Sequence, residues 1–523
     1  MPPYDHMIVL GNPKGFIEYL EVCMSAAGRR ILSVALVALI AIGLVVPGVH
    51  ATSAASTKTI VLTIDSTVAT VAGSRVTLDA APFIAGGRTM LPVRFVAEAM
   101  GAGVSFTTRQ NGSVSRVNLG LPDTPTSLKA ISLSLDSTTA TVDGQTVTLD
   151  TTPVIREGRT FLPIRFIAEQ LGAKVTPTAD PSTGKTRTVT VVLPVVDVEV
   201  PRQMSGAGAT FPLPLYSKMF DVYSSSTGTR VNYQGIGSGG GIKALTDKTV
   251  DFGASDAFLT VAETTTIGAP VLHIPTCVGA VVLTYNLDGN PTLRFDARTV
   301  SDIFLGTITR WNDSRIAALN PSITLPDQAI TTVHRSDGSG TTSIFTNYLS
   351  MAVPIWKTKV GAGKSVSWPV GLGGKGNDGV AGLVSQNRGA IGYVELVYAI
   401  GAKLSYATMR NSSGNFITAS LASSGRAAQI QLPDDLKVLL MNSSDSQAYP
   451  IAAFTWLLVY REQQYSGRTL GQAIALKRVL NWMLTTGQSV NESLGYGKMP
   501  EAAVQKAQKL ISSMTYGGAP IPD

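Results

Sequence analysis

The chain contains few of the side chains that metal centres, disulfide frameworks and many catalytic sites require. Its 523 residues include two cysteines and four histidines. Cys23 precedes an apolar N-terminal run, so removal of that run as an export signal would leave Cys277 alone and exclude an intramolecular disulfide. Between Ala51 and Leu272 there is neither histidine nor cysteine. That stretch therefore lacks the imidazole and thiolate ligands that a metal such as copper prefers.

Charge is sparse as well. Only 15% of the residues are charged, and the net charge of +7 is spread along the chain without a block of lysine and arginine. Aromatic residues are not interleaved with basic clusters, so the basic balance does not indicate nucleic-acid binding. A hydrophobic content of 44% without a low-complexity tract is typical of globular protein. The length exceeds one core and predicts roughly two to four domains.

The N-terminal residues 1–51 are typical of an export signal. Two arginines precede the uncharged, mostly apolar run Ile31–Val46, and Val49–Ala51 supplies small residues at the spacing of a cleavage site. Met24 is an alternative start of translation. The run is short for a membrane span of about 20 residues, although an uncleaved anchor remains an alternative. We therefore expect an exported protein in the periplasm or at the cell surface.

Two copies of one sequence unit follow, offset by 71 residues. Gly87–Glu98, with the sequence Gly-Arg-Thr-Met-Leu-Pro-Val-Arg-Phe-Val-Ala-Glu, recurs as Gly158–Glu169. Each copy predicts short alternating strands, a hairpin turn marked by glycine, and a short helix after the Leu-Pro pair. We expect the copies to occupy residues 58–120 and 129–195 as small α+β domains, separated by a linker at Leu121–Thr126.

These copies resemble the copper amine oxidase N-terminal-like domain. The resemblance rests on the Gly-Arg-Thr…Leu-Pro-(Val/Ile)-Arg-Phe core and covers residues 58–195. Because the stretch lacks histidine and cysteine, we expect no metal and no cofactor there. We interpret the copies as a folded spacer or a module for attachment to the cell wall. Arg94 and Arg165 are expected to cap a helix or pair locally, without a ligand.

The segment His334–Thr342 predicts an oxyanion site. Its arginine, Arg335, is followed by Asp337 and a run of glycines and hydroxyl residues. Apolar residues after it recur at helical spacing, so Gly338–Thr341 should form the first turn of a helix. The N–H groups of such a turn lack partners within the helix and favour anions. The alternative is a serine-capped helix start beside a solvated Arg–Asp pair.

Three upstream segments lie at the ends of predicted strands. Two of them have glycines where the strand meets a helix, and the third ends in an aspartate. They are Ser205–Pro212, Tyr233–Gly241 and Val250–Asp256. Glycine lets a ligand approach the backbone closely. Asp256 falls at the carboxyl end of its strand, and ligands of open α/β sheets bind at that edge.

Together these segments resemble the phosphate-binding protein of bacterial phosphate ABC transporters. The motifs Gly-Ala-Gly-Ala-Thr-Phe-Pro, Tyr-Gln-Gly-Ile-Gly-Ser-Gly-Gly-Gly, Val-Asp-Phe-Gly-Ala-Ser-Asp-Ala and Arg-Ser-Asp-Gly-Ser-Gly-Thr occur in family order within residues 203–516. Trp368–Gly379 and Gly389–Glu395 extend the match. The resemblance implies an α/β, type II periplasmic-binding-protein fold of two lobes with a ligand cleft. We expect the chain to cross between lobes near Val278–Asn286 and Pro450–Tyr460.

The resemblance also implies the residues that bind inorganic phosphate. This predicted anion cage consists of Thr210, Phe211, Ser238, Asp256, Arg335, Ser339, Gly340 and Thr341. Asp337 would support Arg335. An ionised Asp256 can accept the proton that phosphate still carries near neutral pH. Sulfate has no such proton and would be repelled.

The expected function is phosphate capture and delivery to the membrane permease subunits of an ABC transporter. The sequence leaves three alternatives open. An enzyme is disfavoured, since Ser339 lies outside a Gly-x-Ser-x-Gly elbow and strand alternation should turn His334 away from Arg335. A second alternative is another tetrahedral anion such as sulfate or molybdate. A third is a cell-surface protein in which the two copies are the working part.

Overall fold

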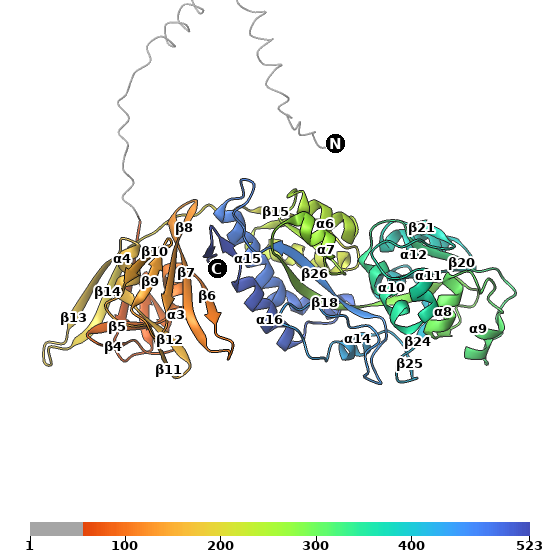
Figure 1. Ribbon diagram of the computed structural model, residues 1–523, viewed down its shortest axis with the longest axis horizontal. Coiled ribbons are helices and arrows are strands. Elements are labelled where there is room, and N and C mark those ends of the chain that lie inside the picture. The colour runs from red at the N-terminus through yellow and green to blue at the C-terminus, as the bar shows by residue number, and fades with distance from the viewer. Residues whose placement is uncertain (1–55) are drawn as a thin grey trace, which may run out of the picture. The chain divides into compact units, whose positions relative to one another are not determined.

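The two N-terminal copies fold together and share their sheets. The computed structural model describes residues 56–523 (Figure 1), so the predicted export signal lies outside the described residues. β1 (Thr57–Thr63) of the first copy pairs along its length with β14 (Thr186–Pro194) of the second. β5 (Arg88–Pro92) pairs with β12 (Arg159–Pro163). A strand edge left unpaired by one copy is thus covered by the other.

The linker predicted between the copies is wrong. β7 (Val114–Thr124) runs through Leu121 and Pro122 and turns directly into β8 (Ser127–Ser134), with which it pairs. Proline and polar residues indicated a break, but the pairing with β8 holds this segment in a sheet.

The short helix of each copy starts where the sequence predicts it. α3 (Val93–Met100) and α4 (Ile164–Gln170) follow Pro92 and Pro163, whose backbones occupy the N-cap positions. Both helices turn apolar side chains into a core that the two copies share. A strand pair follows each helix: β6 (Gly103–Thr108) pairs with β7, and β13 (Lys174–Ala179) pairs with β14.

The remainder of the chain forms two lobes around two joined sheets (Figure 1). The first lobe has the strand order β16-β15-β17-β26-β18 and the second β18-β22-β20-β21. Their bounds are β15 (Gln203–Gly208), β16 (Arg230–Gly235), β17 (Phe252–Ser255), β18 (Val271–Tyr285), β20 (Thr331–Arg335), β21 (Leu372–Gly374), β22 (Ala390–Glu395) and β26 (Ala452–Tyr460).

Both predicted crossings between the lobes are confirmed. β18 pairs with β26 from Val271 to Ala280 and with β22 from Val281 onward, so it passes from one lobe to the other at that point. The chain returns just before Ala452, where β26 begins in the first lobe. Both strands are buried almost throughout, as expected of segments covered on both faces.

The strands that carry site residues lead into helices at one edge of each sheet. β15 and β16 run parallel and precede α5 (Leu213–Thr227) and α6 (Ser238–Thr246). β20 and β21 run parallel and precede α10 (Gly340–Ala352) and α12 (Gly376–Gln386). The fold therefore gathers helix N-termini from both lobes, each with N–H groups that have no partner within the helix.

The C-terminal segment contacts the sheet of the N-terminal copies. β28 (Ala519–Pro520) lies against β6, β7 and β8. A Cβ on Gly103 or Gly120 would lie 2.2 or 1.9 Å from the carbonyl oxygen of Pro520, so this approach requires glycine at both positions. Residues 57–523 accordingly form one compact unit.

Candidate functional site

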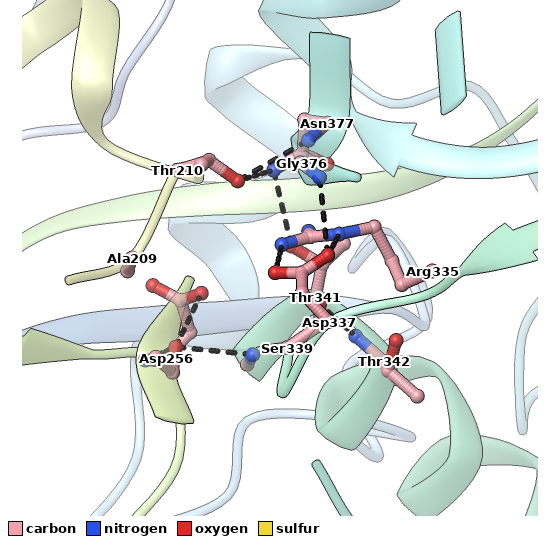
Figure 2. Close-up of polar contacts among 12 residues, drawn as sticks. Ala209, Thr210, Asp256, Arg335, Asp337, Ser339, Thr341, Thr342, Gly376 and Asn377 are labelled. Carbon is pink, nitrogen blue, oxygen red and sulfur yellow. Dashed lines mark hydrogen bonds and ion pairs between the residues drawn. The ribbon is translucent and has the colours of Figure 1, made fainter. Parts of the chain in front are cut away.

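Buried Arg335 and half-buried Asp337 form an ion pair at the end of β20. Nε of Arg335 donates to Oδ1 of Asp337 at 2.8 Å, and Nη2 donates to Oδ2 at 2.5 Å (Figure 2). This two-point contact fixes the plane of the guanidinium. Burial alone would raise the pKa of Asp337, but the hydrogen bonds and charge of Arg335 outweigh it and hold the pKa below its ordinary value. The solvated Arg–Asp pair considered from the sequence is therefore wrong, since the Arg335 side chain is 1% exposed.

The helix start after this pair is present, two residues later than predicted. α10 begins at Gly340, and the Ser339 hydroxyl caps it by accepting from the Thr342 N–H at 3.0 Å. The Ser339 N–H donates to the carbonyl of Lys364 at 2.8 Å. This backbone N–H, which the sequence predicted as a donor to the anion, is therefore already used. The Ser339 hydroxyl still has its own proton to donate.

The first lobe brings Ser238 and Asp256 to the same place. Asp256 directly follows β17, as predicted from the sequence. The Ser238 hydroxyl donates to Oδ2 of Asp256 at 3.5 Å and accepts from the N–H groups of Asp256 at 3.3 Å and Gly340 at 3.0 Å. Because Gly340 belongs to the second lobe, this hydroxyl joins the two lobes at the site.

Asp256 is fully enclosed. Burial raises its pKa to about 7, against the opposing effects of a hydrogen bond from Thr455, the charge of Arg335 and a hydrogen bond from Ser238. The Thr455 hydroxyl donates to Oδ1 of Asp256 at 2.5 Å. A carboxyl with this pKa exchanges its proton near neutral pH, so it can accept or donate a hydrogen bond there.

Thr210 also reaches the site, and the carbonyl groups of Thr210 and Phe211 are held by two tyrosines that the sequence reasoning missed. Tyr398 donates its hydroxyl proton to the Thr210 carbonyl, and Tyr496 donates to the Phe211 carbonyl at 2.7 Å. The Thr210 carbonyl and the Phe211 N–H share one peptide plane. Tyr398 therefore fixes the direction of the N–H that the sequence assigned to the anion cage.

Asn377, at the start of α12, is a further residue that the sequence reasoning missed. Its Nδ2 donates to the hydroxyl oxygen of Thr210 at 3.0 Å and to that of Thr341 at 3.2 Å (Figure 2). Asn377 occurs in the Trp368–Gly379 motif, three residues after the end of β21. The strand-to-helix rule that singled out Ser238 would also have singled out Asn377.

The two histidines within the described residues lie away from the anion cage. The ring of His334 stacks on Trp368, with centroids 4.9 Å apart and planes 9° apart, and its Nδ1 lies 3.1 Å from the backbone carbonyl oxygen of Arg335. Burial lowers the pKa of His273 to about 4, and its Nε2 accepts from the N–H of Leu259 at 3.3 Å. Neither ring is placed to transfer a proton at the site.

The architecture defines the class of protein. Two lobes share a long crossing strand, and polar helix starts from both lobes meet between them. The profile described as the PBP superfamily domain matches residues 176–486. The profile of the copper amine oxidase N-terminal domain matches residues 49–114 and 125–190. The α/β, two-lobed fold preceded by two repeat units is thus confirmed.

Curated relatives identify the family within that class. The phosphate-binding protein PstS of Xylella fastidiosa (strain 9a5c) is 40% identical over 316 residues, which are 60% of this chain and 85% of the relative. PstS of Pasteurella multocida (strain Pm70) is 40% identical over 310 residues, 58% of this chain and 88% of the relative. A crystal structure of a phosphate-binding protein from Stenotrophomonas maltophilia superposes with a TM-score of 0.45 at 18% identity, covering 58% of this chain and 93% of that one. The chain belongs to the PstS family of phosphate-binding proteins.

Proposed function

We propose that this chain captures inorganic phosphate between its two lobes and delivers it to the permease subunits of a phosphate ABC transporter. Its 40% sequence identity to PstS proteins supports this function. The observation that carries it is the buried Arg335, held by Asp337 beside the start of α10, whose charge acts on the buried Asp256 of the other lobe. The proposed ligands are those of the anion cage: Thr210, Phe211, Ser238, Asp256, Arg335, Ser339, Gly340 and Thr341.

The energies of such a cage are sufficient for tight binding. A hydrogen bond to a charged group contributes about 1.5–3 kcal/mol. Micromolar affinity requires about 8 kcal/mol. Several such bonds exceed this even after ordering and desolvation are subtracted.

Asp256 supplies the choice of anion. Phosphate near neutral pH brings a proton that lies between its oxygen and the Asp256 carboxylate. Sulfate brings none, so it requires a protonated Asp256, and the share of that form falls about tenfold for each pH unit above the pKa of about 7. The preference for phosphate over sulfate should therefore grow as the pH rises.

Titration calorimetry at pH 6 and pH 8 tests this scheme. We expect tight phosphate binding at both values, and sulfate binding that is roughly ten times weaker at pH 8. In Asp256→Asn the amide can donate a hydrogen bond to sulfate at any pH. The preference for phosphate over sulfate should therefore be smaller in this variant and should not change with pH. Failure of the protein to bind phosphate would refute the function. Equally tight binding of sulfate at pH 8 would refute the role of Asp256.

The other parts of the chain fit an exported receptor. We propose a signal at residues 1–51, two repeat units that meet in the hairpin of β7 and β8, and a phosphate-binding domain at 203–516, with the protein at the periplasm or cell surface. Within residues 56–523 no helix is long and apolar enough to cross a membrane. The repeats, or an uncleaved N-terminal run, would retain the protein at the envelope. Recovery of all the protein from the medium would contradict retention.

Catalysis is not part of the proposal. The relatives that match this chain are named as phosphate-binding proteins. A phosphomonoesterase assay should show no turnover above that of a buffer control.

A further inference from the structure

The side chain of Asn377 ties together hydroxyl groups from both lobes. It is fully buried at the start of α12 in the second lobe. Its Nδ2 donates to Thr210 of the first lobe at 3.0 Å and to Thr341 of the second at 3.2 Å, and its backbone N–H also donates to the Thr210 hydroxyl oxygen at 3.2 Å (Figure 2). All three bonds end on hydroxyl oxygens of the anion cage.

The orientation of the Asn377 amide is determined by a third neighbour. The backbone N–H of Glu395 donates to Oδ1 of Asn377 at 3.0 Å. A flipped amide would place its NH₂ group against this N–H donor, so Nδ2 must face the two threonines. The amide is thus a donor toward the anion cage.

Counting lone pairs then gives the direction of both hydroxyl protons. A hydroxyl has one proton and two acceptor lone pairs. The Thr210 oxygen accepts twice from Asn377, and the Thr341 oxygen accepts once from Asn377 and once from Nη1 of Arg335 at 3.3 Å. With both lone pairs engaged, each hydroxyl can only donate to a further partner.

We propose that Asn377 is a positioning residue that makes Thr210 and Thr341 obligate hydrogen-bond donors to the bound anion. The inference rests on the proposed function. It explains how hydroxyls, which can accept as well as donate, are restricted to the role that an anion requires. Because Thr210 lies in the other lobe, the same contact also stabilises the approach of the lobes.

Two substitutions test the proposal by titration calorimetry with inorganic phosphate on the full-length protein. Asn377→Leu has similar volume but no donor, so the hydroxyls are released to rotate, and we expect phosphate binding about 10-fold weaker. Asn377→Asp keeps the shape of the side chain, but its carboxylate accepts hydrogen bonds from both hydroxyls and adds a negative charge. We therefore expect phosphate affinity to fall by more than about 100-fold. Asn387→Leu, at the far end of the same helix, is the matched control and should change the affinity by less than about twofold.

A double-mutant cycle separates positioning from a merely structural role. In a Thr210→Val/Thr341→Val background no hydroxyl remains to be oriented, so Asn377→Leu should change phosphate affinity by less than about twofold. An equal loss in both backgrounds would overturn the proposal, as would wild-type affinity in Asn377→Asp. Thermal unfolding of each variant without phosphate identifies any that fail to fold. If the leucine or valine variants do not fold, the phosphate affinity of Asn377→Asp tests the proposal. If the unmodified protein bound no phosphate, the proposed function itself would fail.

Discussion

Asp256 should make the stability of the protein fall as the pH rises. Its carboxyl has an ordinary pKa of 3.8 and a pKa of about 7 in the folded chain, because burial disfavours the charged form. The folded state therefore holds the proton more tightly than the unfolded state does. The contribution of this group is fully present below pH 4 and is lost as the pH rises to about 7.

The size of the loss follows from the shift. About three pKa units correspond to about 4 kcal/mol, an upper value because the lobes can separate and hydrate the carboxylate. For a domain of this length such a change corresponds to roughly 5 °C in Tm. Asp256→Asn removes the titration, and its amide oxygen can still accept from Thr455. We therefore expect the variant to melt a few degrees above the unmodified protein at pH 8.

Differential scanning calorimetry at pH 5 and pH 8, in buffer without phosphate or sulfate, measures the effect. The advantage of Asp256→Asn should be largest at pH 8 and small at pH 5. Asp136→Asn is the matched control, because Asp136 is exposed and has a φ of 65° that asparagine also adopts. Its Tm should follow the unmodified protein at both pH values. A constant difference between Asp256→Asn and the unmodified protein, or a less stable variant at pH 8, would refute the reasoning.

Three further substitutions test the geometry by phosphate titration. A Cβ in Gly340→Ala would lie 2.4 Å from Oδ2 of Asp256, so the lobes could not approach fully, and phosphate should bind at least about 10-fold more weakly; unchanged affinity would contradict this. Asp337→Asn cannot accept both hydrogen bonds of Arg335, so the guanidinium loses its fixed plane and affinity should fall about 10- to 100-fold, whereas Asp337→Glu should restore part of it. Tyr398→Phe leaves the Thr210 carbonyl without its hydrogen-bond donor and should weaken phosphate binding about fivefold. Sulfate binding should weaken equally, because Tyr398 orients the Phe211 N–H and does not contact the proton of the anion.

The local parts of the site were predictable because their signals are short in sequence. Arginine at a strand end, serine at an N-cap, and glycine at a strand-to-helix junction specify backbone and capping geometry within a few residues. For this reason Arg335 and Asp256 are where the sequence placed them, whereas Ser339 caps α10 from the position just before it. The repeat pattern likewise predicted strands and short helices, since these follow from alternation and from the Leu-Pro pair.

The pairing of strands between the two copies was not predictable. Every unpaired strand edge offers the same backbone N–H and C=O groups, so the sequence does not specify which strand will pair with a given edge. The linker expected at Leu121–Thr126 became a hairpin for that reason, and β1 joined the sheet of β14 at the other end of the repeat region.

The sequence by itself determined the two-lobed fold, the helix start beside Arg335 and the residues that we propose as phosphate ligands. The tertiary structure alone decided how those residues act on one another. Thr210 and Asn377 are 167 positions apart, and Asp256 and Thr455 are 199 apart. Burial raises the pKa of Asp256 and two accepted bonds direct the Thr210 proton, and both effects arise only when distant segments exclude water and meet within hydrogen-bonding distance.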